Sequence, residues 1–188
     1  FLTREVKRRA YAPFRDCSEA EFGAAVDALS RQVPDLTDMQ ISVGLHRLLC
    51  RLGDAHIDVS LPEGHPEYRR LLPVQFALFE EGLFIVAADP AQAALLGAQV
   101  LQVSGLPAEE VLAALDAIVP RDNGNGQWPK HIVPQRLREL PLLNALGIAA
   151  NSREVALTIR DLSGATDTVV LTAEYAAPPG MRAIASFV

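Results

Sequence analysis

Cysteine, long apolar runs and the common cofactor motifs are scarce or missing in this sequence of 188 residues. The two cysteines, Cys17 and Cys50, are too few for a disulfide scaffold and lack the spacing of a metal site. No apolar run is long enough to span a membrane, and there is no glycine-rich phosphate loop, dinucleotide fingerprint or series of base-stacking aromatic residues. We therefore expect no cofactor, no membrane insertion by this segment and no nucleic-acid partner.

Positive charge is also in the minority. Lys and Arg number 17 against 23 Asp and Glu, so the formal net charge is −6, which argues against a polybasic surface for nucleic acid or lipid. Hydrophobic residues make up 49% and charged residues 21%, the balance of a folded globular chain. The length allows one full domain or two small ones. Because the first residue is Phe1 rather than Met, we expect a piece of a longer protein.

The first sixty residues predict a helical hairpin. Ser18 and Glu21 fit a capping box, and apolar residues then recur at the spacing of one helix face. Thr37 and Gln40 form a second capping box, followed by another apolar face that ends at Gly53. Two helices joined by a short linker form an antiparallel pair.

The rest of the chain predicts an α+β fold with short elements. Apolar runs between turn residues predict strands at residues 73–79, 83–87, 100–103, 155–159 and 168–173. Helices are predicted at residues 90–96, 107–119 and 135–146, the last bent or interrupted by Pro141. Residues 120–131 have the composition of a surface loop, and the stretch beyond residue 176 that of a linker.

No complete hydrolytic site is found in these residues. Ser104 follows a predicted strand but lacks the first glycine of a Gly-x-Ser-x-Gly elbow, so it is interpreted as a turn serine. Cys50 lies at the end of an apolar helix face, which favours a buried structural thiol over a nucleophile. Glu80 and Glu81 are interpreted as a solvated turn. We therefore expect this chain alone to hydrolyse nothing.

A metal site is a further hypothesis. His56, Asp58 and His65 offer two imidazoles and a carboxylate, which is a ligand set for zinc or iron. Their spacing matches no compact metal motif, so we expect no bound metal. A metal-dependent enzyme built on these three residues remains as the third hypothesis for function.

Three segments, taken in order, resemble the front part of the C-terminal processing, or tail-specific, serine peptidase family. In that family a helical segment ends in Asp-x-His followed by Ser or Thr. Here Gly53 is followed by Asp54 and His56, with Ile57 in the last place. The other two segments are residues 72–74 leading into 82–86, and residues 96–107.

The last of these segments matches the mark of the family's PDZ-like domain, Gly-x-x-Val-x-x-Ile-x-Gly before a helix. Gly97, Val100, Val103 and Gly105 keep that register. The glycines suit sharp turns, and the valines suit the interior of a small barrel. The resemblance covers residues 18–120 well and the terminal hairpin loosely.

The resemblance implies a helical cap over residues 1–60, a PDZ-like α+β domain with inserted helices over 61–175, and a linker from 176 to 188. It places the catalytic residues in a later domain and makes a peptide or protein substrate and that downstream domain the partners. The parent protein would be a serine endopeptidase outside the cytoplasm, periplasmic or secreted. This chain would position or gate the peptide. The alternative is a stand-alone PDZ-like binding module without proteolysis.

Two roles for residues are implied by the resemblance. The peptide groove would lie along the strand Gly82, Leu83, Phe84, Ile85 and Val86, which adds the peptide as a further strand; the alternative is a plain core strand. At the end of the hairpin we expect a structural role. There the carboxylate of Asp54 caps backbone amides. The ring of His56 forms a hydrogen bond across the junction to the β-rich part.

Overall fold

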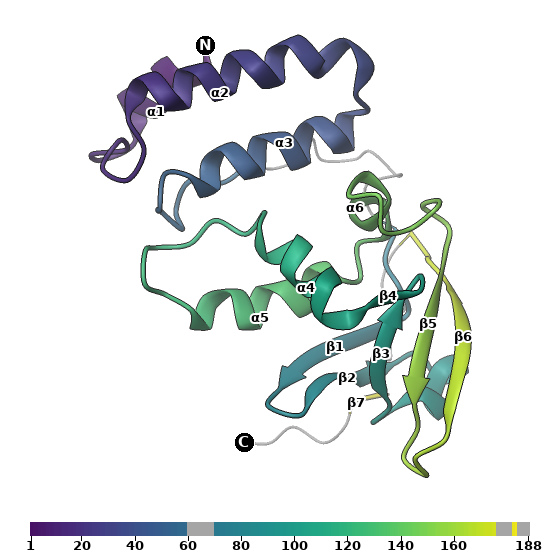
Figure 1. Ribbon diagram of the computed structural model, residues 1–188. Helices are drawn as coiled ribbons and strands as arrows, with labels where there is room; N and C mark the ends of the chain where they lie inside the picture. The colour runs from purple at the N-terminus through teal and green to yellow at the C-terminus, as the bar shows by residue number, and fades with distance from the viewer. Residues whose placement is uncertain (60–69, 176–181, 184–188) are drawn as a thin grey trace.

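The computed structural model describes residues 1–59, 70–175 and 182–183 of the chain. Figure 1 shows three helices layered at one end of the molecule, an antiparallel sheet at the other, and further helices between them. The predicted α+β class is confirmed. Among the described helices, none combines the length and the apolarity needed to cross a bilayer.

The helical end consists of α1 (Leu2–Arg9), α2 (Glu19–Gln32) and α3 (Asp38–Cys50), with a short 3₁₀ turn, η1 (Val33–Asp35), after α2. Both predicted capping boxes are present. The Ser18 hydroxyl accepts the amide of Glu21 at 3.2 Å, and the Thr37 hydroxyl accepts the amide of Gln40 at 3.3 Å. Each box satisfies backbone donors that a helix start would otherwise leave unpaired.

We expect Thr37→Ala to lower the free energy of unfolding by about 1 kcal/mol, because it removes the cap of α3. Urea denaturation measures the change. Ser30→Ala is the matched control, since it removes an exposed hydroxyl from the interior of α2, where alanine is at least as favourable. Equal stability of the two variants would contradict a contribution from the cap.

The sheet contains β1 (Val74–Phe79), β2 (Gly82–Ala88), β3 (Gln99–Val103), β4 (Leu106–Pro107), β5 (Glu154–Arg160), β6 (Thr166–Thr172) and β7 (Arg182–Ala183). Its order is β1-β2-β3-β5-β6, with β4 beside β3 and β7 beside β2. The predicted hairpins β1–β2 and β5–β6 are confirmed. The linker prediction is wrong at residues 182–183, which pair with the end of β2; the rest of that segment lies outside the described residues.

The helices between the cap and the sheet are η3 (Pro90–Leu95, a 3₁₀ helix), α4 (Ala108–Asp116), α5 (Gln127–Arg136) and α6 (Leu140–Ala145). Two predictions are wrong here. The surface loop ends early because the Asn125 side chain accepts the amides of Gln127 and Trp128, which starts α5. The single bent helix is two helices, and Pro141 lies in the first turn of α6, where a missing N–H costs nothing.

Two hydrophobic clusters stabilise the chain. The larger one lies between the sheet and α4–α6 and includes Met39 and Val43 of α3. The smaller one lies within the cap, around the fully buried Phe22, and includes Leu48 and Leu49 of α3. Helix α3 therefore joins the cap to the β-rich part. The predicted boundary between residues 60 and 61 lies outside the described residues.

Candidate functional site

The segment after α3, residues 53–59, lies where the cap meets the β-rich part. Gly53 has a φ of +62°, so the chain reverses there at a position that favours glycine. Oδ1 of Asp54 accepts the amide of His56 at 2.8 Å, which is the turn bond expected for this carboxylate. The amide of Ala55 donates to Oδ1 of Asp122 at 3.1 Å. That bond ties the segment to the loop between α4 and α5.

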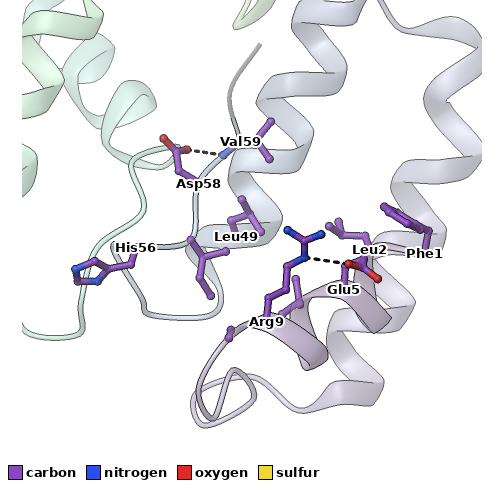
Figure 2. Close-up of a pocket in the computed structure, with 11 residues that line it drawn as sticks. Phe1, Leu2, Glu5, Arg9, Leu49, His56, Asp58 and Val59 are labelled. Carbon is purple, nitrogen blue, oxygen red and sulfur yellow. Dashed lines mark hydrogen bonds and ion pairs between the residues drawn. The ribbon is translucent and has the colours of Figure 1, made fainter. Parts of the chain in front are cut away.

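The ring of His56 does not bond across the junction as expected. Its Nδ1 lies 3.3 Å from Oδ1 of Asp54, and its side chain is 88% exposed. The tight turn holds the ring beside the carboxylate of Asp54. Figure 2 shows the ring directed away from Arg9 and Glu5. Among the described residues, Asp54 is its hydrogen-bond partner, and Nε2 faces solvent. A carboxylate beside Nδ1 and a solvent-facing Nε2 are features that an acid–base histidine requires.

The structure describes two of the three predicted metal ligands. Figure 2 shows the side chains of His56 and Asp58 at separate positions along the segment, and His65 lies outside the described residues. The structure instead places one ligand atom each from Asp54, His56 and Asp122 within 4.8 Å of one another. All three side chains reach solvent, where such groups are common without an ion. We assign no metal to them.

Asp58 lies beside a buried histidine of α3. Its Oδ1 is 3.1 Å from Nε2 of His46. Glu139, the residue before α6, lies nearby, and burial raises the pKa of its carboxyl group. Arg136 approaches Glu139 at 3.3 Å. A cleft of about 230 Å³ is lined by Asp58, Trp128, Arg136 and Glu139, and not by His46.

The predicted peptide-binding strand, residues 82–86, lies inside the sheet. Phe84 pairs with Ala77 of β1 on one side and with Gln99 of β3 on the other. Leu83 and Ile85 are almost completely buried. A peptide cannot add to a strand whose two edges are occupied, so strand addition at β2 is ruled out. The arrangement matches the alternative, a core strand.

One outer edge of the sheet is β1, and the other is β6. No described strand pairs with the outer side of β1. Phe79 and Gly82 close a two-residue turn and therefore share a pair of hydrogen bonds. Hydrogen-bonded and non-hydrogen-bonded pairs alternate along two antiparallel strands. The amides of Leu78 and Phe76 therefore point away from β2. These two amides face a cleft of about 530 Å³ between β1 and α5.

The α5 side of this cleft carries positive charge. Lys130 and Arg138 line it together with His131 and Gln135. The guanidinium of Arg138 is half-buried, and its Nε has no hydrogen-bond partner in the described residues. Burial lowers the pKa of this side chain, because the charged form loses contact with water. We call the cleft between β1 and α5 the edge groove.

A third cleft of about 450 Å³ lies between α1, α3 and residues 56–59, as Figure 2 shows. Leu2, Leu49 and Val59 line its apolar part. Glu5 at its rim is paired with Arg8 at 2.7 Å and Arg9 at 3.0 Å, which lowers the pKa of that carboxyl group. The charges of this cleft therefore neutralise one another.

The residues of the PDZ-like mark occupy structural positions. Gly97 and Gly105 both have a φ of +81°, which side chains rarely adopt, and Val100 and Val103 are buried. Ser104 has a φ of +51° in the turn between β3 and β4.

Cys50, which the sequence pattern disfavours as a nucleophile, also lies at a position that suits a structural residue. Burial raises the pKa of the Cys50 thiol to about 11, so the thiolate that a nucleophile requires is scarce at neutral pH.

Comparison with known proteins relates the fold to one enzyme. No family model matches the sequence, and no curated protein is similar enough to count as a relative. Among solved structures, mature CPAF complexed with lactacystin matches with a TM-score of 0.57 and 19% identity, over 92% of this chain and 33% of the CPAF chain. Mature CPAF alone matches with a TM-score of 0.55 and 17% identity, over 80% of this chain and 28% of that chain.

The fold is therefore similar to that of a part of CPAF, a C-terminal processing serine protease. This chain spans about a third of the length of the CPAF chain. At such low identity the likeness shows the fold alone.

Proposed function

We propose that this chain is the N-terminal region of a tail-specific-type serine peptidase and positions a peptide substrate for a downstream catalytic domain. The edge groove carries this proposal. It combines an outer strand of the sheet, whose amides at Phe76 and Leu78 point away from β2, with a helix across a cleft, which is the geometry that binds an extended peptide by strand addition. The likeness to part of CPAF supports the peptidase context.

The groove also suits one end of a peptide. The outward amides of Phe76 and Leu78 would pair with the peptide backbone, while Lys130 and Arg138 offer positive charge to a carboxylate. A short groove buries little surface and ordering a peptide opposes binding, so we expect a dissociation constant in the micromolar range or weaker.

A stand-alone binding module would use the same groove without proteolysis. The two functions require different domains after this chain in the intact protein. A downstream α/β domain that holds a nucleophilic serine supports the peptidase, and its absence supports the module.

The groove is tested by NMR titration of this chain with a peptide that ends in apolar residues and a free carboxylate. We expect shifts at the amides of Phe76 and Leu78, and weaker binding when the peptide carboxylate is amidated. Leu78→Pro removes an outward N–H and should abolish binding, because proline is tolerated at a strand edge but cannot donate. Leu78→Ala is the matched control, which shortens the side chain and keeps the amide.

Equal binding by the proline and alanine variants would contradict strand addition at β1. So would shifts confined to residues 82–86, or no shift at millimolar peptide.

A second role is favoured by the geometry of His56. A carboxylate-oriented, solvent-facing imidazole is of use to a nucleophile that another domain supplies. In this role the chain contributes the acid–base residue of the parent peptidase in addition to binding the peptide.

A further inference from the structure

The cleft of about 230 Å³ lies where residues 55–58 meet α5, and we call it the junction cleft. Its apolar lining comes from residues on α5 and shortly before it: Val119, Pro120, Trp128 and Ile132. Its charged lining is Asp58, Arg136 and Glu139. Small-molecule sites usually measure about 300–1,000 Å³. The junction cleft therefore has a size that suits one side chain rather than a cofactor.

The charges of the junction cleft do not cancel. Among the described residues, two carboxylates and one guanidinium line it, and the guanidinium of Arg136 lies 3.3 Å from Glu139. No Lys or Arg side chain in the described part of the chain pairs with Asp58. Nε2 of His46 lies 3.1 Å from Oδ1 of Asp58 but forms no hydrogen bond. The charge of this half-exposed carboxylate is therefore available to a ligand.

The second carboxylate is also incompletely compensated. Burial raises the pKa of the Glu139 carboxyl group, although Arg136 acts in the opposite direction. The nearby cations therefore do not fully replace the water that the charged form loses. A further cation in the junction cleft would stabilise both carboxylates.

Trp128 adds a surface that suits a cation with an apolar stem. Its side chain lines the junction cleft and is 42% exposed. Cations bind to the faces of tryptophan rings, and the stems of Lys and Arg pack on apolar surface while their charged ends stay near polar groups. A basic side chain can thus place its stem against Ile132 and Val119 and its charged end near Asp58.

The junction cleft adjoins both the edge groove and the segment that carries His56. Gln135 lines the edge groove and the junction cleft, so the two clefts meet at α5. Ala55 and Asp58, which line the junction cleft, flank His56 in the chain. Figure 1 shows α5 between the cap and β1. An extended peptide that leaves the edge groove over α5 therefore passes the junction cleft before it reaches residues 53–59.

We propose that the junction cleft is a specificity subsite that takes one basic side chain, arginine or lysine, of a peptide substrate. Asp58 and Glu139 bind its charged end, and Trp128 and Ile132 pack against its stem. The proposal rests on the proposed function, in which the edge groove holds another part of the same peptide. A helix is about 10–12 Å across and an extended residue spans about 3.3 Å, so the basic residue lies about three or four residues from the part that pairs with β1.

The test is a titration of this chain with Nα-acetyl-arginine N-methylamide, which has no free carboxylate and is too short for strand addition. Trp128 is the only tryptophan of the chain, so its indole N–H signal and its fluorescence report directly on the junction cleft. We expect shifts at this indole and at the amides of Asp58 and Ile132, with a dissociation constant in about the millimolar range. The citrulline compound has the same shape without the charge and should bind at least about tenfold more weakly. The lysine compound carries the same charge as arginine and should also bind.

Asp58→Asn keeps the shape of the side chain and its contact with the amide of Val59 but removes the charge. It should weaken binding of the arginine compound by about tenfold or more, the effect of losing one charge-assisted hydrogen bond. Glu80→Gln, at the exposed turn between β1 and β2, is the matched control and should bind normally. Trp128→Leu, followed through the amide of Ile132, should also weaken binding and decides the matter should Asp58→Asn fail to fold.

Equal binding of the arginine and citrulline compounds would overturn the basic subsite, as would equal binding by the Asp58→Asn and Glu80→Gln variants. A longer peptide with arginine at the expected position should bind about tenfold more tightly than its citrulline form. If that peptide binds at β1 but arginine gives no gain, the junction cleft does not lie on its path and the proposal fails. If the short compound binds while no peptide shifts Phe76 and Leu78, the edge groove alone is contradicted.

Discussion

From the proposed acid–base role, replacing His56 by alanine is expected to lower kcat for peptide hydrolysis by the full-length protein by at least about 10³-fold, while leaving the stability of this chain unchanged. The side chain is 88% exposed and its contact is with a neighbouring carboxylate, so removing it exposes no core. A base that takes the proton of a nucleophile has no substitute once removed. Peptide hydrolysis by the full-length protein and the melting temperature of this chain measure the two effects.

Asp54→Asn should also lower kcat strongly, because the amide no longer favours the ring orientation and proton placement that the carboxylate provides. His131→Ala, which removes another exposed histidine, is the control and should retain activity. A His56→Ala protein with normal kcat would contradict the acid–base role of this residue. This chain alone should hydrolyse no peptide or ester with or without the substitution.

The second large effect concerns the core. We expect Leu157→Ala to lower the free energy of unfolding by about 2–5 kcal/mol, because it leaves a cavity at a fully buried position of β5. Leu157 pairs with Val103 of β3 and Val169 of β6, so the cavity would lie where the sheet joins both strands. A domain of this size has about 5–15 kcal/mol in total, so the loss is a large share.

Urea denaturation followed by circular dichroism measures this loss. Val170→Ala on the adjacent strand β6 is the control, since Val170 is 60% exposed and its truncation should change stability by less than about 0.5 kcal/mol. Similar midpoints for the two variants would show that β5 does not lie at the centre of the core.

Elements defined by local patterns could be predicted from the sequence. The capping boxes at Ser18 and Thr37 depend on residues three positions apart, and the β1–β2 turn depends on two residues between apolar runs. The turn bond from Asp54 to the amide of His56 is equally local. These interactions form within a few residues, so their spacing is visible in the sequence.

Predictions failed where two patterns competed or distant residues met. Pro141 indicated a bend or a break within one helix, whereas it lies in the first turn of α6, after α5 has ended at Arg136. Asn125 carried a helix-start signal that the loop-like composition of its surroundings obscured. The run 82–86 has the same apolar residues whether it lies at an edge or in the centre of a sheet, so strand order could not be inferred from it.

The sequence by itself determined the α+β class, the capped helices and the two hairpins. It also determined the short distance between the carboxylate of Asp54 and the imidazole of His56. The tertiary structure alone decided that β1 is an outer edge of the sheet, that α5 lies across a cleft from it, and that Asp58 lies beside His46 instead of beside His56. The reason is the range of the interactions. Hydrogen bonds within a turn depend on residues two or three apart, whereas the Ala55–Asp122 bond joins residues 67 apart and exists only once the whole core has formed.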